Sequence, residues 1–392
     1  MAHSLGEAVH DRAPGDRERD RNRKCEQSAL CMPDARLGAM PDVVFSAPCT
    51  VQASCGGLGV FARERIPAGT ILLSERPFAL TPSFAERSRV CAVCFQQATP
   101  PEEWTIHCGM CGCVSYCTDA CRQFASTAEL HSQAECSAFR AWSQGEGFDA
   151  TDPLNDLVIQ AIRILAHRLA GVRIRALDST DVDAVAYHSY AHRLLAMRRN
   201  ARTSNGIKKA VQATLHAFPE AHVEAKELAG LLSRHQCNVF GVLGERGSSV
   251  GLASFLGAMH LFNHSCMPNA AFDSVPAITQ GRGEPATFRL VSILDISPGE
   301  EICHCYAASA DGPSKRLQYL RDNHGFECVC VRCACDDPSE EAELAEQLDE
   351  VRCCLPSCGS GLSFPVAGQG RSDVVVRQCV HCGGRWECDE GV

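Results

Sequence analysis

The stretch Asn263-His264-Ser265-Cys266-Met267-Pro268-Asn269 decides how this chain is organised, because the other motifs stand around it in a fixed order. An apolar run over residues 252–262 precedes it, and a strand-like run that ends at Gly299-Glu300-Glu301 and Tyr306 follows it. Four of its seven residues carry side chains that donate or accept hydrogen bonds, and Cys266 offers a thiolate ligand. A polar turn between two buried segments predicts a ligand site rather than a packing contact.

The composition is that of a globular protein with room for two or three domains: 45% of the 392 residues are hydrophobic and 21% are charged. The net charge of −10 disfavours direct nucleic-acid binding and suits basic partners. No apolar run approaches the roughly 18 residues that span a bilayer. Residues 1–40 carry mixed charge without the apolar core of a secretory signal, so we expect a disordered tail there. The expected location is the nucleus, the cytoplasm or both.

The 26 cysteines are the strongest feature of the composition. Without a secretory signal, clustered cysteines indicate metal binding rather than disulfides. Residues 91–136 contain ligand pairs but few large aliphatic side chains, so bound metal has to replace a missing core. Two tetrahedral zinc sites fit the eight ligands Cys91, Cys94, Cys108, Cys111, Cys117, Cys121, His131 and Cys136. Cys113 is an alternative to Cys111, although the two-residue spacing favours Cys111.

A third site is indicated by Cys328-x-Cys330-x2-Cys333, which offers three thiolates and lacks one for a tetrahedron. Cys266, about 60 residues upstream, is the expected fourth ligand. Such a zinc ion would tie the segment near residue 330 to the organising stretch and would hold Phe326 over the ligand of His264. We therefore expect a clasp rather than a catalytic metal.

Residues 336–392 combine an acidic helix with a fourth cysteine set. Asp337-Pro338-Ser339-Glu340 predicts a helix start, and residues 336–350 hold eight acids and no Lys or Arg. A solvated helix face is the preferred interpretation, and attraction of lysine-rich substrate tails is the alternative. A small zinc ribbon is predicted from Cys354, Cys358, Cys379 and Cys382, with Cys353 and Cys388 as alternates.

Hydrophobic periodicity predicts short strands from residue 43, helices over most of 150–235, and strands again after residue 236. Gly57-x-Gly59 fits either a hairpin turn or a place where a cofactor approaches the backbone. The predicted helices cover residues 154–169, 184–199, 207–217, 222–234 and 316–320.

The cysteine pairs of residues 91–136, with Tyr116-Cys117-Thr118-Asp119-Ala120-Cys121, resemble a MYND finger. The resemblance implies interleaved sites, one of Cys91, Cys94, Cys117 and Cys121 and the other of Cys108, Cys111, His131 and Cys136.

The whole set of motifs resembles the SET domain of the SET–MYND (SMYD-type) protein-lysine methyltransferase family over roughly residues 42–335. The motifs, in family order, are Gly57-x-Gly59, the finger, a helical insert, Cys237-Asn238-x-Phe240, the organising stretch, Gly299-Glu300-Glu301, Tyr306 and Phe326-x-Cys328-x-Cys330-x2-Cys333. The resemblance implies an α+β protein: a SET-type β fold of small sheets with a helical insert, an inserted MYND zinc finger and a cysteine-rich post-SET segment. The C-terminal zinc ribbon predicted from the cysteine spacing follows it.

The expected division of the chain follows from these motifs. It is a tail (1–40), the N-terminal part of the SET domain (41–90), the finger (91–136), the helical insert (137–235), the SET core (236–308), the post-SET zinc segment (309–335), and the acidic helix with the ribbon (336–392).

The implied activity is methyl transfer from S-adenosylmethionine to a lysine ε-amine of a histone or another protein. Tyr306 would line the lysine channel as the catalytic residue. The implied cofactor contacts are Gly57, Leu58 and Gly59 at the methionine portion, Asn238 at its amino-acid end, Asn263 and His264 through backbone and ring hydrogen bonds, and Phe326 stacked on adenine. Three zinc ions are expected, with a fourth at the ribbon.

Two departures from the family pattern qualify this expectation. Gly56 stands where the family often has a basic residue, so one carboxylate contact is expected to be missing. The chain ends at Val392, without the helical-repeat domain of larger relatives, so a more open substrate cleft is expected. The rival hypothesis is an adaptor whose finger docks a proline-rich peptide while the SET part serves as a scaffold.

Overall fold

The computed structural model of the chain describes residues 45–54, 57–128, 130–170, 201–244, 248–255, 257–274, 283–307, 311–335, 337–356, 358, 361–366 and 374–389. The predicted tail of residues 1–40 and the predicted helix over 184–199 lie outside them. Within the described part of the chain, no helix is both long and apolar enough to cross a membrane.

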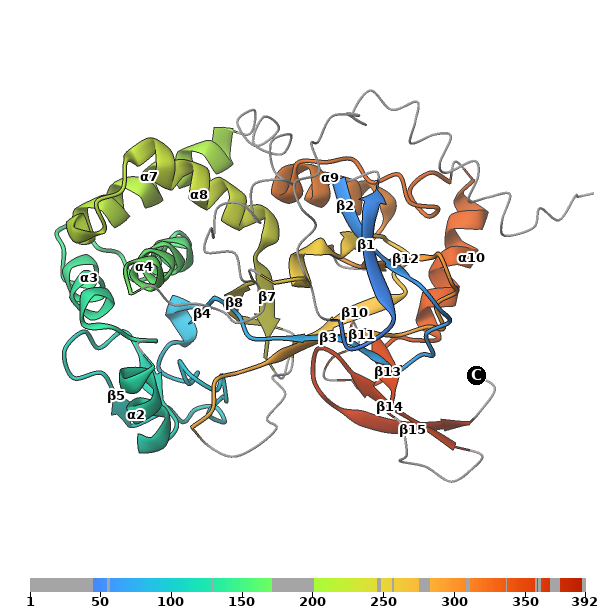
Figure 1. The fold of residues 1–392 in the computed structure, drawn as a ribbon, viewed down its shortest axis with the longest axis horizontal. Helices are drawn as coiled ribbons and strands as arrows, with labels where there is room; N and C mark the ends of the chain where they lie inside the picture. The colour runs from blue at the N-terminus through green and yellow to red at the C-terminus, as the bar shows by residue number, and fades with distance from the viewer. Residues whose placement is uncertain are drawn as a thin grey trace, which may run out of the picture.

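Small sheets with helices packed around them form the α+β fold that the sequence predicts (Figure 1). One four-stranded sheet has the order β1-β2-β12-β9, with bounds Cys49–Ser54, Gly57–Ala62, Glu301–His304 and Asn263–His264. Three three-stranded sheets are β10 (Ala270–Asp273), β11 (Phe288–Ser292) and β3 (Ile71–Glu75); β4 (Ala79–Pro82), β8 (Ser249–Ser254) and β7 (Phe240–Leu243); and β13 (Ser363–Pro365), β14 (Val374–Cys379) and β15 (Arg385–Asp389).

The four-stranded sheet brings three distant motifs together. Strand β2 carries the glycine motif, β9 begins the organising stretch, and β12 follows Gly299-Glu300. β12 pairs with β2 in antiparallel register and with β9 in parallel register, so that Cys303 lies beside Asn263 and His304 beside His264. Gly57 and Gly59 therefore lie within a strand and not in a hairpin turn.

The finger and the helical insert form one end of the molecule (Figure 1). The finger contains β5 (Ile106–His107), β6 (Ser115–Tyr116) and α2 (Asp119–Thr127), and α3 (Gln133–Ser143) leads from it into the insert, which contains α4 (Asn155–Leu169), α7 (Ala201–Ala217) and α8 (Ala225–Asn238). Their apolar side chains share a single core, in which Cys121 of the finger and Ile162 and Leu232 of the insert are completely buried. The finger is therefore packed into the rest of the fold rather than attached to it.

Helix α4 follows the predicted pattern closely, because its apolar residues recur at helical spacing and nearly all of them are buried. Asp152 Oδ1 accepts the Leu154 N–H at 2.9 Å just before the helix begins at Asn155. The helices predicted over 207–217 and 222–234 correspond to α7 and α8. Helix α8 extends further than predicted, through Asn238, and β7 begins two residues later at Phe240.

The C-terminal segments pack back on the sheets. Helix α9 (Pro313–His324) precedes the cysteine-rich segment, and α10 (Pro338–Asp349) begins with Asp337, whose side chain accepts the Ser339 N–H as predicted. The ribbon of β13–β15 shares a core with the β10–β11 pair, where Leu362 and Val380 lie against Ala271 and Val291.

Candidate active site and metal centres

Asn263 ties three strands to one another. Its Nδ2 donates to Leu58 O at 3.0 Å and to Glu301 Oε1 at 2.8 Å. Glu301 Oε1 also accepts the Ser54 hydroxyl at 2.7 Å. A Cβ atom on Gly59 would lie 2.4 Å from that carboxylate oxygen, so glycine is required where β2 passes the Asn263–Glu301 pair.

Asn269, at the other end of the organising stretch, makes a second tie. Its Nδ2 donates to Glu300 Oε1 at 2.8 Å and to Glu301 O at 2.9 Å, while its Oδ1 accepts the Cys303 N–H at 2.9 Å. Asn269 and the two glutamates were not predicted as site residues from the sequence. The sequence pattern that could have indicated them is an asparagine at each end of the organising stretch, Asn263 and Asn269, together with the consecutive acids Glu300 and Glu301.

His264 uses both ring nitrogens inside the protein. Nδ1 accepts the Tyr306 backbone N–H at 2.9 Å, and Nε2 lies 3.2 Å from Cys266 Sγ. An accepting Nδ1 leaves the proton on Nε2, which points at the sulfur. The ring therefore positions Tyr306 and Cys266 relative to each other.

Tyr306 is held from two sides. Its backbone binds His264, and its hydroxyl donates to Phe262 O at 2.7 Å. Its ring lies 4.7 Å from the ring of His304, 5.0 Å from His324 and 5.2 Å from His264, measured between centroids. Phe326 packs edge-on against it at 6.4 Å. This packing fixes the orientation of the phenol before any ligand binds.

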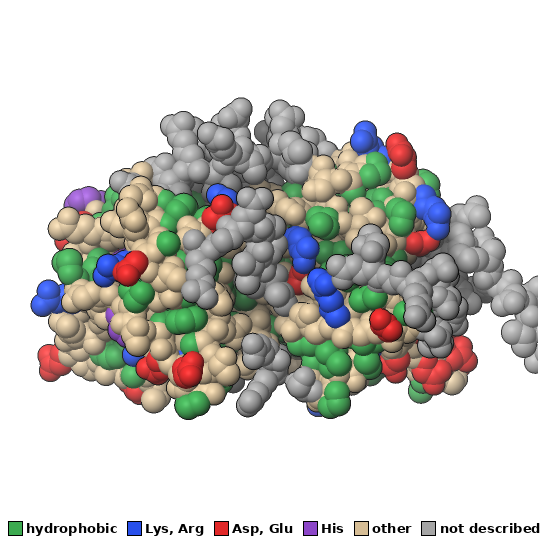
Figure 2. Space-filling model, turned by 90° about the horizontal axis from the view of Figure 1, so that it is seen from below, with side chains coloured by type: hydrophobic (Ala, Val, Ile, Leu, Met, Phe, Trp, Pro, Cys, Tyr) green, Lys and Arg blue, Asp and Glu red, His purple; other side chains and the backbone are tan. Residues whose placement is uncertain are grey.

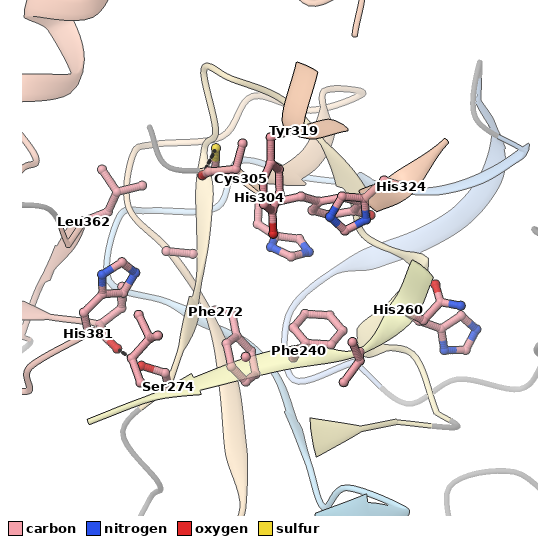
Figure 3. A pocket seen from close by; sticks show the side chains of 18 of the residues that line it. Phe240, His260, Phe272, Ser274, His304, Cys305, Tyr319, His324, Leu362 and His381 are labelled. Carbon is pink, nitrogen blue, oxygen red and sulfur yellow. Dashed lines mark hydrogen bonds between the residues drawn. The ribbon is translucent and has the colours of Figure 1, made fainter. Parts of the chain in front are cut away.

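A cavity of about 400 Å³ adjoins Tyr306 (Figure 3). In the view of Figure 3, Phe240 and Phe272 lie on one side, His304 and Tyr319 on the other, and His260 and His381 at opposite ends. The described residues that line it include no Asp, Glu, Lys or Arg. The cavity is therefore aromatic and carries no formal charge as long as its histidines are neutral.

Burial keeps two of these histidines neutral at physiological pH. Loss of solvation, together with the nearby His264 and His324, lowers the pKa of His304 to about 3. Burial likewise lowers the pKa of His260 to about 4. His304 Nε2 and both ring nitrogens of His260 have no hydrogen-bond partner among the described residues. Such buried polar atoms are normally met by a ligand or by ordered water.

The predicted site residues fall into two groups around Tyr306. Tyr306 itself and Asn238 line the cavity. Asn263, His264 and Phe326 are not among the lining residues; the rings of His264 and Phe326 pack against the phenol, and β2 with Gly57, Leu58 and Gly59 joins them through the Asn263 contact to Leu58 O. The structure thus brings all of them to one locality and leaves the glycine strand outside the cavity wall.

Four groups of ligand atoms are arranged as a metal ion requires. They are Cys91, Cys94, Cys117 and Cys121; Cys108, Cys111, His131 and Cys136; Cys266, Cys328, Cys330 and Cys333; and Cys353, Cys358, Cys379 and Cys382. The Sγ–Sγ distances of 3.4 Å for Cys266–Cys333 and 3.9 Å for Cys353–Cys382 are too long for disulfides. They match the edge of about 3.8 Å of a tetrahedron with Zn–S bonds of about 2.3 Å. Each donor set therefore fits zinc.

Three groups have the predicted members, and the fourth requires a correction. Cys354 was predicted as a ligand, but it is exposed, and its alternate Cys353 is buried and belongs to the group instead. Arg352 pairs with Leu362, and Cys353 N donates to Gly361 O, so the backbone is extended here. Consecutive side chains of an extended backbone point to opposite sides, and only Cys353 points inward. Cys388, the other alternate, lies outside the group.

Charged side chains hold His131, a ligand of the finger, in place. His131 Nδ1 contacts Glu135 Oε2 at 2.6 Å, and Glu135 Oε1 accepts Arg163 Nε at 2.5 Å. Arg163 also donates a hydrogen bond through Nη1 to Leu80 O of β4 at 2.7 Å. Such a carboxylate on a metal-binding histidine sets its tautomer and orientation.

A family model described as SET domain matches residues 57–307. The chain is 29% identical over 280 residues to the N-lysine methyltransferase SMYD2-B of Danio rerio, covering 71% of this chain and 58% of that relative's length. It is 26% identical over 342 residues to the histone-lysine N-methyltransferase ASHR2 of Arabidopsis thaliana, covering 80% of this chain and 78% of that protein.

Among solved structures, the chain resembles one described as the SET domain of LSMT bound to lysine and AdoHcy, with a TM-score of 0.37 and 12% identity. That match covers 73% of this chain and 54% of the other. The chain thus spans little more than half the length of SMYD2-B and of this structure.

Proposed function

Because the chain belongs to the SET-domain family, we propose that it is a protein-lysine N-methyltransferase that takes its methyl group from S-adenosylmethionine. The observation that carries this proposal is the position of Tyr306, which is fixed by Phe262 and His264 and borders an uncharged cavity. The family match, obtained over residues 57–307, includes Phe262 and His264, whose hydrogen bonds hold Tyr306 in place.

The hydroxyl of Tyr306 suits an accepting role. Its only hydrogen is given to Phe262 O, so its oxygen can only accept from a group in the cavity. An amine N–H of the target lysine fits that requirement, and the resulting hydrogen bond aims the nitrogen lone pair away from the phenol. S-adenosylmethionine, when bound, supplies an electrophilic methyl group on its sulfonium sulfur. The chain contributes mainly alignment, which is what an in-line displacement needs.

The cavity also favours the reactive form of lysine. A free lysine has a pKa of about 10.4 and is mostly protonated, but burial away from counter-charges disfavours the ammonium form. The described lining residues offer no carboxylate that would stabilise an ammonium ion. Neutral imidazoles such as His304 remain available to hydrogen-bond the substrate or water.

For the cofactor we propose the residues already named: Asn238 at the cavity wall, the backbones of Asn263 and His264, Phe326 at the adenine, and Gly57, Leu58 and Gly59 near the methionine portion. The side chain of Asn263 is engaged with Leu58 and Glu301, which supports a backbone rather than a side-chain contact. For the four cysteine-rich groups we propose structural zinc, because each offers a closed set of four ligands.

Finer aspects of the function are also proposals. The substrate is a protein with a target lysine, a histone among the candidates, and the finger is proposed to dock a proline-rich peptide. We propose a nuclear or cytoplasmic location and no direct nucleic-acid contact. In support, Lys and Arg side chains of the described residues are scattered on the face in Figure 2 and form no continuous stripe.

The test is label transfer from methyl-labelled S-adenosylmethionine to histones and to a cell lysate. We expect Tyr306→Phe to lower labelling by about 100-fold or more, because the amine loses its aligning acceptor. Tyr116→Phe is the matched control, since it makes the same change at a tyrosine buried in the finger. Equal labelling by Tyr306→Phe and the parent would remove Tyr306 from the reaction.

The same samples separate the enzyme from an adaptor. An enzyme must bind S-adenosylmethionine, and calorimetry should detect this binding at micromolar concentrations for the parent and both variants. Absence of both binding and labelling in the parent would favour the adaptor.

A further inference from the structure

The C-terminal ribbon forms one end of the cavity. Leu362, Val380 and His381 line it there, and Figure 3 places Leu362 and His381 opposite His260. The remaining lining residues come from the SET core and from α9. The cysteine spacing of the ribbon predicts only a metal site, so its contribution to the cavity is a new element of the site.

This end of the cavity is held rigidly. Ser274, which follows β10, donates to Val380 O through its backbone N–H at 3.0 Å and through its hydroxyl at 2.9 Å. Leu362 and Val380 are buried in the core that the ribbon shares with β10 and β11. A wall fixed by both hydrogen bonds and packing can discriminate between ligands, because it does not yield to a poorly fitting one.

The fourth ligand group controls the direction of His381. Val380 and His381 stand between the ligands Cys379 and Cys382, and His381 N donates to Cys379 Sγ at 3.3 Å. A Cβ atom on Gly361 would come within 2.4 Å of Cys379 Sγ and 3.0 Å of His381 Cβ, so this glycine lets the turn close. A zinc ion in this group would therefore fix the turn that carries two of the three wall residues.

The chemistry of the wall excludes charge. Leu362 and Val380 present aliphatic groups, and His381 Nδ1 is buried without a hydrogen-bond partner among the described residues. A charged side chain placed here would lose its hydration without gaining a counter-ion. An aliphatic or aromatic side chain would bury apolar surface at no such cost.

The cavity is large enough for more than the target lysine. Its volume of about 400 Å³ lies in the range of pockets that hold drug-sized ligands. Tyr306 and Asn238 mark the part assigned to methyl transfer, so a neighbouring substrate residue can occupy the ribbon end.

We propose that the ribbon end of the cavity, formed by Leu362, Val380 and His381, binds an uncharged aliphatic or aromatic side chain next to the target lysine and thereby selects the substrate. This proposal rests on the proposed methyltransferase function. It makes the ribbon a specificity element of the enzyme in addition to a folded metal-binding unit.

The probe is an array of synthetic peptides, each with one lysine in an alanine and serine background and one neighbouring position varied. The full chain, His381→Asp, His381→Ala and the control Val374→Asp are assayed with methyl-labelled S-adenosylmethionine. Val374 lies on β14 of the same ribbon and does not line the cavity, so it receives the same charge away from the wall.

We expect the parent and Val374→Asp to favour peptides with an aliphatic or aromatic neighbour. His381→Asp should raise the KM of these peptides about tenfold and shift the preference toward Lys or Arg, with kcat and cofactor affinity within about twofold. His381→Ala should broaden the preference for the neighbouring peptide residue. If His381→Asp no longer binds the cofactor, the peptide preference of His381→Ala tests the role of the ribbon instead.

The outcomes are distinguishable. Labelling with the same preference in the parent, His381→Asp and His381→Ala would overturn the role of the ribbon and leave the methyltransferase intact. A parent that prefers charged neighbours would also overturn it. A parent that labels no peptide, histone or lysate protein would overturn the proposed function itself.

Discussion

The histidines of this chain differ in role according to what surrounds each ring. His264 is fixed by hydrogen bonds at both nitrogens and aligns Tyr306. His131 belongs to a ligand group and is oriented by Glu135. His235 is buried at the end of α8, where its Nδ1 lies 2.9 Å from the Ser254 hydroxyl. Burial lowers the pKa of His235 to about 4, so the folded protein holds this ring neutral.

The depressed pKa of His235 predicts a loss of stability in acid. The unfolded chain binds a proton at this ring below a pH of about 6.5, whereas the folded chain does so only near pH 4, so its contribution is lost as the pH falls through this window. His235→Gln, which cannot titrate, should reduce the drop in unfolding free energy between pH 7 and pH 5 by about 2 kcal/mol. Urea unfolding at the two pH values measures this difference. His216→Gln, at an exposed site on α7, should leave the drop unchanged, and an equal drop in His235→Gln and the parent would refute the assignment.

At the scale of elements, the cysteine-rich segment after α9 is joined to the organising stretch and to α10 by charge. A zinc ion bound by four thiolates carries a net charge of about −2, which needs compensation when buried. Arg316 of α9 is completely buried, and although burial alone would lower its pKa, the thiolates of Cys266 and Cys333 raise it. Arg316 and Arg332 both contact Glu341 Oε1, at 3.1 and 2.9 Å, so α10 is bound to the same centre.

Removing the charge of Arg316 should therefore loosen this one centre. We expect Arg316→Met to speed zinc release from the group of Cys266, Cys328, Cys330 and Cys333 by roughly tenfold or more, with the other groups unaffected. A chromogenic chelator follows the release, and elemental analysis should give four zinc ions per chain at the start. Arg321→Met is the control, because Arg321 lies on the same helix and pairs only with the exposed Glu327 in the described contacts. Identical release curves for the two variants would show that Arg316 does not stabilise the centre.

At the scale of the whole molecule, the finger is not an independent module. Its side chains share a core with α4, α7 and α8. In addition, the contacts from His131 through Glu135 and Arg163 to Leu80 connect a metal ligand to a strand of the SET part. Glu135 is completely buried, and although burial would raise its pKa, Arg163 and His131 lower the pKa to about 2.

This coupling predicts that a destabilising substitution in the finger lowers the stability of the entire fold. Glu135→Gln should weaken zinc binding at the His131 group by about 10- to 100-fold. It should also lower the thermal unfolding temperature in a single transition, because the finger and the insert unfold together. Differential scanning calorimetry distinguishes this from a separate early transition, which would instead indicate an independently folding finger. Glu146→Gln, at an exposed position after α3, serves as the control.

The sequence by itself determined the family, the fold class and three of the four ligand groups. These follow from short spacings such as Cys91-x2-Cys94 and from the order of motifs along the chain, which are local properties. Tertiary structure alone decided which of two adjacent cysteines enters the fourth group, because an extended backbone at residue 353 turns one side chain inward. It also decided that the side chain of Asn263 ties strands together, and that the ribbon closes one end of the cavity beside Tyr306. The last two features arise from packing between segments more than 35 residues apart, for example 38 between Asn263 and Glu301, and no local pattern in the sequence encodes such contacts.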